Sequence, residues 1–136
     1  MDAPGAHEGP HGPAITAGGK YGGQVVAVIA LAPGHATTPP AVRYTAEGVR
    51  SEGQEVRVYF FDTDMKKLDL GPLPAKLDGN LESKWKGKHE GQAFVLEKGA
   101  DYYKGTAPAP KRRPFNLEVQ FKMGAEKFYA GLDNQV

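Results

Sequence analysis

The chain has 136 residues, the size of a single domain with a hydrophobic core of its own. Its 17 lysines and arginines nearly balance its 16 aspartates and glutamates, so a net charge of +1 excludes a strong electrostatic case for binding nucleic acid or an anionic membrane. The absence of cysteine excludes disulfides, thiolate metal sites, iron–sulfur clusters and cysteine nucleophiles. The 18 glycines and 11 prolines favour many short strands and turns.

Segment 1–14 (MDAPGAHEGPHGPA) is too rich in proline and glycine for a helix or a central strand, so it is predicted to be a flexible arm in front of one domain at 15–136. The segment lacks the basic start and apolar stretch of a signal peptide. It resembles a mature chain that has gained a start methionine, and this predicts a periplasmic or secreted protein whose signal peptide has been removed. The longest apolar run, 25–32, is too short to span a membrane, so no transmembrane segment is expected.

The first half of the chain predicts two clear strands. Residues 24–32 (QVVAVIALA) are β-branched and apolar on both faces, and residues 55–61 (EVRVYFF) alternate between an apolar face and a mixed face. Between them, 33–53 is rich in proline and glycine and is predicted as loop, with a brief pairing at 41–45.

In the second half, segment 75–86 has leucines at helical spacing, but its Asp-Gly-Asn centre favours a bulged strand or a hairpin. Further strands are predicted at 92–97, 101–105, 115–122 and 125–132, with a proline-rich loop at 106–114. Residues 115–122 alternate cleanly, and Met123-Gly124 turns the chain into an antiparallel hairpin with 125–132.

About seven short strands with turns every 8 to 12 residues or so predict an all-β fold, a single antiparallel β-sandwich of immunoglobulin-like or cupredoxin-like type. The predicted core consists of Val26, Val28, Val56, Val58, Phe60, Phe94, Leu96, Leu117, Val119, Phe121 and Phe128.

The N-terminal arm contains the letters of a zinc-protease motif, from His7 to His11 with Glu8 between them. That motif works on a helix, and Pro10 in its interior would cost about 3 kcal/mol, so a metalloprotease is not expected. The two imidazoles can still bind copper, zinc or nickel from a loop, with Glu8 adding an oxygen and His35 a third nitrogen. The alternative is four exposed histidines without a metal.

Two other features favour a binding protein that needs no metal. An exposed row among the six tyrosines and Trp85 could stack on sugars, although core packing is the commoner role of such residues. The basic loop at 111–113 could dock an acidic partner.

No catalytic set is found. The only serines, Ser51 and Ser83, do not lie in a nucleophile turn, and an enzyme is not expected. Asp62 and Asp64 begin like a calcium loop, but the later ligands are missing, so turn chemistry is the better interpretation.

Several short segments together resemble small exported β-domains that also occur at the front of adaptor (membrane fusion) proteins of heavy-metal efflux pumps. The segments are 11–13 (HGP), 18–21 (GGKY), 24–26 (QVV), 56–68 (VRVYFFDTDMKKL) and the closing hairpin from 114 to 128. The resemblance implies an all-β sandwich in the periplasm with a histidine near the opening motif as a metal contact. The chain differs from the pattern at Pro13 and in a proline- and glycine-rich insertion at about 33–53.

The leading hypothesis is therefore an exported, non-enzymatic metal-binding or metal-handling domain, connected with heavy-metal resistance. A divalent ion of copper, zinc or nickel would bind His7, Glu8, His11 and His35, with an affinity that falls in acid as the imidazoles take up protons. The partners expected are the metal ion and a periplasmic protein, without nucleic acid, and the chain is expected to be a monomer or a dimer. The alternative hypothesis is an interaction module without metal, which binds a protein or a glycan through a sheet face or the basic loop.

Overall fold

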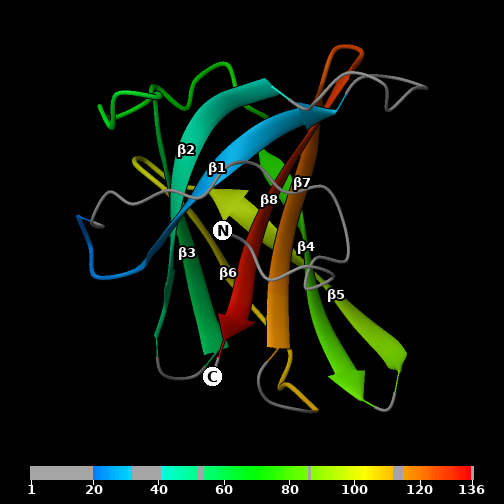
Figure 1. The fold of residues 1–136 in the computed structure, drawn as a ribbon. Helices are drawn as coiled ribbons and strands as arrows, with labels where there is room; N and C mark the ends of the chain where they lie inside the picture. The colour runs from blue at the N-terminus through cyan, green and yellow to red at the C-terminus, as the bar shows by residue number, and fades with distance from the viewer. Residues whose placement is uncertain (1–19, 32–40, 52–53, 86, 112–114, 136) are drawn as a thin grey trace.

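The computed structural model describes residues 20–31, 41–51, 54–85, 87–111 and 115–135, which contain eight antiparallel strands (Figure 1). They close into one barrel in the order β1-β2-β3-β6-β5-β4-β7-β8, with β8 paired to β1. The strands are β1 (Gln24–Leu31), β2 (Ala41–Arg50), β3 (Glu55–Phe61), β4 (Lys76–Trp85), β5 (Lys88–Lys98), β6 (Tyr103–Thr106), β7 (Phe115–Met123) and β8 (Glu126–Gln135).

The prediction of an all-β fold is confirmed, but the prediction of a sandwich of about seven strands is wrong. The sheet closes on itself because β1 pairs with both β2 and β8, and because β6 joins β3 to β5. Each strand of a small barrel alternates between core and solvent as a sandwich strand does, so the local pattern is the same in both architectures. The predicted arm 1–14 lies outside the described residues.

The interior of the barrel is filled by side chains from every strand. Nine of the predicted core residues are buried, and the other two, Val26 and Phe94, are partly buried and pack against them. Phe121 stacks on Phe128 at 5.0 Å between ring centroids, and Phe60 meets Phe121 edge-on at 5.9 Å. A second, smaller cluster on the other face of β1 and β8 contains Ala27, Ile29 and Tyr129, which confirms that β1 is apolar on both faces.

The edge of β5 that faces β6 is paired over only a small part of its length. β5 pairs with β4 along its whole length, but with β6 only at Glu97 and Lys98. Further along the same edge, the side chain of Lys111 forms an ion pair with Glu90 of β5 at 2.9 Å. Pro108 and Pro110 have no N–H to donate, which explains why the ladder does not continue there.

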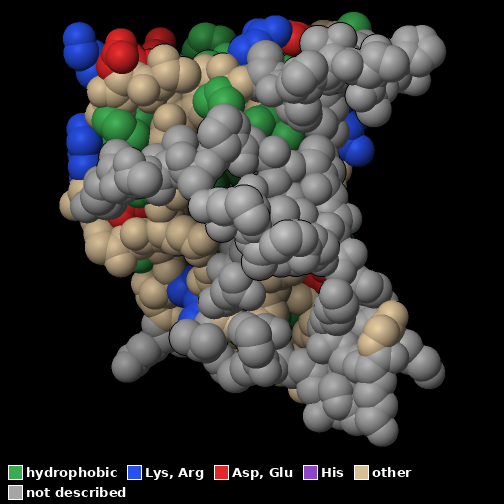
Figure 2. Space-filling view, viewed as in Figure 1, with side chains coloured by type: hydrophobic (Ala, Val, Ile, Leu, Met, Phe, Trp, Pro, Cys, Tyr) green, Lys and Arg blue, Asp and Glu red, His purple; other side chains and the backbone are tan. Residues whose placement is uncertain are grey.

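Charged side chains are mixed over the described surface. On the face shown in Figure 2, basic and acidic side chains lie next to one another along the upper edge. None of the described residues forms a helix long and apolar enough to cross a membrane.

Candidate functional site

The residues predicted to bind metal, His7, Glu8, His11 and His35, all lie outside the described residues. Within the described part of the chain, no group of three or more histidine, aspartate or glutamate side chains could hold a metal ion. Metal binding by the N-terminal arm therefore stays a prediction. Of the predicted basic loop, only Lys111 is described, and its amino group is paired with Glu90.

The described surface does contain a row of aromatic side chains on the outer face of β3. Tyr21 stacks on Tyr59 with 3.8 Å between ring centroids and 14° between ring planes, and Tyr102 lies 5.1 Å from Tyr59 on the other side. Tyr21 is 49% exposed, while Tyr59 and Tyr102 are half-buried. We call these three residues the tyrosine face.

The alternation of β3 explains why one member of the row points outward. Val58 and Phe60 are buried in the barrel, so Tyr59, which lies between them, points away from the core. Tyr102 precedes Tyr103, which is fully buried and pairs with Val58, so Tyr102 comes to the same outer surface. Phe61 is buried beside this row, with its ring centroid 6.4 Å from that of Tyr21.

Tyr21 is held in place by a buried carboxylate on β2. Glu47 is fully buried although it points away from the core, and its two carboxylate oxygens accept hydrogen bonds from three backbone N–H groups. The donors are the amides of Lys20, Tyr21 and Gly23, at 2.8, 2.9 and 2.6 Å. Hydrogen bonds to a charged acceptor are about twice as strong as neutral ones, so Glu47 fixes the backbone that presents the Tyr21 ring.

The two glycines that follow Tyr21 are required for different reasons, one by its backbone angle and the other by a close approach to β2. Gly22 has a φ of +78°, which favours glycine, and a Cβ added to Gly23 would lie 2.2 Å from the carbonyl oxygen of Gly48. The amino group of Lys20 donates to the carbonyl of Met65 at 2.7 Å and lies 5.1 Å above the ring of Phe61. Local sequence patterns do not reveal this contact, because Glu47 lies 27 and 26 positions after Lys20 and Tyr21 in the chain.

Charged pairs flank the tyrosine face at both ends. The guanidinium of Arg57 lies 5.1 Å over the ring of Tyr102 and is hydrogen-bonded to the carboxylate of Glu55. The hydrogen bond to Glu55, and to a smaller extent the one to Tyr59, raises the pKa of this guanidinium above its usual value. Lys67 is paired with Asp101 at 2.5 Å, and this bond raises the pKa of the Lys67 amino group. Each of these two cations thus has a carboxylate partner, and the surface combines apolar ring faces with fixed hydrogen-bonding groups.

Comparison with known proteins gave no match to a family model, to a curated protein or to a solved structure. The resemblance to the domains of efflux-pump adaptor proteins therefore remains an expectation from the sequence.

Proposed function

We propose that the protein is a binding module that holds a neutral glycan on the tyrosine face. The observation that carries this proposal is the stacked row of Tyr21, Tyr59 and Tyr102 on the outside of the barrel, with Tyr21 half exposed. A tyrosine ring is flat, rigid and apolar with a polar tip, so it presents contact area at a low cost in conformational entropy. A pyranose ring has a flat C–H face bordered by hydroxyl groups, and it matches such a surface.

The two ion-paired cations beside the row favour a neutral ligand. Arg57 and Lys67 are each neutralised by a carboxylate, so neither contributes the uncompensated charge that a phosphate backbone requires. The same paired groups still offer hydrogen-bond donors and acceptors in fixed positions, which suits the hydroxyl groups of a sugar. An exported location, as the sequence predicts, would bring this face into contact with polysaccharides outside the cytoplasm.

The test is a titration with soluble neutral oligosaccharides of glucose, xylose, mannose and N-acetylglucosamine, followed by calorimetry and by backbone NMR. We expect one of these series to bind with saturable shifts at Tyr21, Tyr59 and Tyr102. Tyr21→Ala should weaken that binding about tenfold, or about 1.4 kcal/mol, since it removes the most exposed ring of the row.

Val95→Ala is the matched control, because Val95 is 48% exposed on β5 and lies outside the row. The proposal is wrong if no oligosaccharide shifts the signals of the row, or if Val95→Ala and Tyr21→Ala weaken binding equally. Saturable binding of a proline-rich peptide to the row without any glycan binding would also reject it, in favour of a protein partner.

Glu47→Gln tests the positioning of Tyr21 separately. A glutamine at this place would turn its NH₂ group toward backbone N–H donors, so the segment at residues 20–23 should detach and glycan affinity should fall at least as much as in Tyr21→Ala. NMR signals of β7 and β8 should remain those of the folded barrel. Unchanged ring contacts between Tyr21 and Tyr59 in this variant would show that Glu47 does not hold the site.

A further inference from the structure

The wall of the barrel opens where β4 and β7 separate. Their ladder ends at the pair Asp78 and Gln120, but β4 begins earlier, at Lys76, and β7 continues to Met123. Beyond the last pair, β4 remains paired with β5, and β7 with β8. The sheet therefore has a gap between the β4–β5 hairpin and the β7–β8 hairpin.

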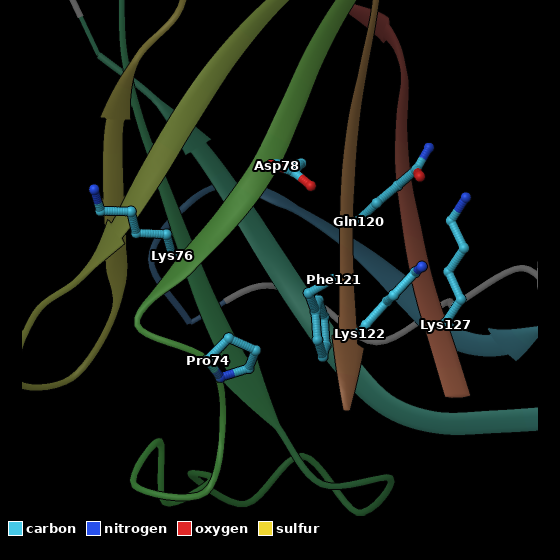
Figure 3. A pocket seen from close by; sticks show the side chains of 7 residues that line it. All are labelled: Pro74, Lys76, Asp78, Gln120, Phe121, Lys122 and Lys127. Atoms are coloured by element: carbon cyan, nitrogen blue, oxygen red, sulfur yellow. The ribbon is translucent and has the colours of Figure 1, made fainter. Parts of the chain in front are cut away.

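A hollow of about 300 Å³ lies at this gap (Figure 3). This volume is at the lower end of the range for small-molecule sites. Phe121 is part of the barrel core and gives the hollow an apolar wall. The hollow is lined by Pro74, Lys76, Asp78, Gln120, Phe121, Lys122 and Lys127.

Two of the lysines around the hollow carry like charges on neighbouring strands. Lys122 and Lys127 are directly opposite in the β7–β8 ladder, and Figure 3 shows their side chains extending on the same side as Gln120. Like charges in such a pair destabilise a sheet. If the β4–β7 ladder continued for two more residues, Lys76 would lie directly opposite Lys122. The gap therefore keeps Lys76 apart from Lys122 and Lys127.

These two lysines are not compensated by described carboxylates. No ion pair within the described residues includes Lys122 or Lys127, whereas Lys76 lies 3.9 Å from Glu97 on β5. Among the described residues, Asp78 is the one carboxylate that lines the hollow, and it lies across from the two lysines on β4 (Figure 3). An anion between Lys122 and Lys127 would remove the repulsion and gain two charge-assisted hydrogen bonds.

We infer that the hollow between β4 and β7 binds the oxyanion of a small organic acid, a carboxylate or a phosphate monoester. Lys122 and Lys127 hold the oxyanion, the amide of Gln120 donates a further hydrogen bond, and the body of the ligand rests on Phe121 and Pro74. Asp78 accepts a hydrogen bond from a hydroxyl or amino group of the ligand and disfavours a second negative charge on that side. This site is separate from the tyrosine face and does not depend on its function.

The experiment uses benzoate and phenyl phosphate as probes, with benzyl alcohol as the uncharged analogue, in NMR titrations of the full chain. We expect saturable shifts at Gln120 and Phe121 with at least one anionic probe and none with benzyl alcohol. The stronger of the two probes tells a carboxylate ligand from a phosphate ester. Lys122→Gln and Lys127→Gln should each raise the dissociation constant about tenfold, and their melting temperatures should not fall, since each removes a repulsion.

Lys66→Gln is the matched control, because it makes the same change in net charge at an exposed turn away from the hollow. Its dissociation constants should equal those of the unaltered chain. The inference is overturned if neither anion saturates below about 10 mM, if benzyl alcohol binds equally well, or if Lys66→Gln weakens binding as much as the other two. Shifts confined to Tyr21, Tyr59 and Tyr102 would also overturn it.

Discussion

At the scale of single residues, two buried polar groups tie distant parts of the barrel together. Glu47 fastens segment 20–23 to β2, and the hydroxyl of Tyr103 donates to the carbonyl of Pro74 at 2.6 Å. Tyr103 is fully buried, and this burial raises the pKa of its hydroxyl to about 12. The folded barrel therefore requires the neutral form of this side chain.

The raised pKa of Tyr103 predicts a loss of stability in alkali. Because the value in the folded chain exceeds that in the unfolded chain, about 10, the contribution of Tyr103 is complete below pH 10 and is lost as the pH rises to about 12. The loss amounts to about 2 to 3 kcal/mol. Denaturant unfolding across this range should show a smaller alkaline loss for Tyr103→Phe than for the unaltered chain.

At neutral pH, the same variant should be less stable than the unaltered chain. Tyr103→Phe leaves the carbonyl of Pro74 without its donor, so the free energy of unfolding should fall there by about 1 to 2 kcal/mol. If the two proteins instead lose stability in parallel from neutral pH to alkali, the alkaline transition belongs to other groups.

At the scale of elements, the short strand β6 is the least extensive part of the barrel wall. It has four residues, and it alone joins β3 to β5. Gly105 lies at its centre, where a Cβ would come 2.4 Å from the carbonyl oxygen of Val95 and 3.2 Å from the Cα of Leu96. These are backbone atoms that cannot rotate away, so the close approach of β6 to β5 depends on this glycine.

Gly105→Ala should therefore open the wall between β5 and β6. We expect a loss of about 2 to 4 kcal/mol in the free energy of unfolding, with amide exchange accelerated first in β6. The control is Gly91→Ala, where the added Cβ meets only the side-chain amide of Asn80. Equal losses in the two variants would show that β6 makes no special contribution to closure.

The elements also show how far the sequence predicts the fold. The strand at 115–122 and its hairpin were predicted, and β7 and β8 confirm them, because a strand with one buried face alternates visibly. In contrast, only a brief pairing at 41–45 was predicted where β2 continues to Arg50. Gly48 weakens the strand signal there, and in the barrel it makes room for the side chain of Leu132, which would lie 2.4 Å from an added Cβ.

The candidate site was harder to predict than the strands. The predicted alternation of residues 55–61 between an apolar face and a mixed face is confirmed, with Arg57 and Tyr59 partly exposed between buried neighbours, whereas Phe61 at the end of β3 is buried. The stacking of Tyr21 on Tyr59 depends on Glu47, and a glutamate in a strand is ordinarily expected to be solvated. The metal prediction on His7 and His11 concerns residues that the structure does not describe, and a calorimetric titration of His7→Ala/His11→Ala with copper, zinc and nickel would test it.

At the scale of the whole molecule, the described strands form one closed sheet around one main core. Every described strand contributes at least one ladder of three or more residue pairs, and the main core cluster includes side chains from all eight. Removing any one strand would expose the interior to water. The barrel is therefore expected to unfold as a single cooperative unit.

Calorimetry tests this cooperativity directly. We expect one thermal transition in which the calorimetric enthalpy equals the van't Hoff enthalpy, with the same midpoint by tyrosine absorbance and by far-ultraviolet circular dichroism. An early separate transition of the β4–β5 hairpin, which extends from the lower right of the barrel in Figure 1, would contradict it.

The pairing of β1 with β8 has a consequence for synthesis of the protein. Ile29, Ala30 and Leu31 find their partners in residues 127–129, nearly one hundred positions later, so the nascent chain cannot complete its barrel until β8 has left the ribosome. Until then, the edge of β1 that pairs with β8 in the folded barrel has no partner strand. Ring closure between such distant strands is slow compared with local hairpin formation, and we expect the β4–β5 and β7–β8 hairpins to form first and the closing seam last. The edge of β1 that pairs with β8 therefore stays without its partner until the last of the described strands has been synthesised.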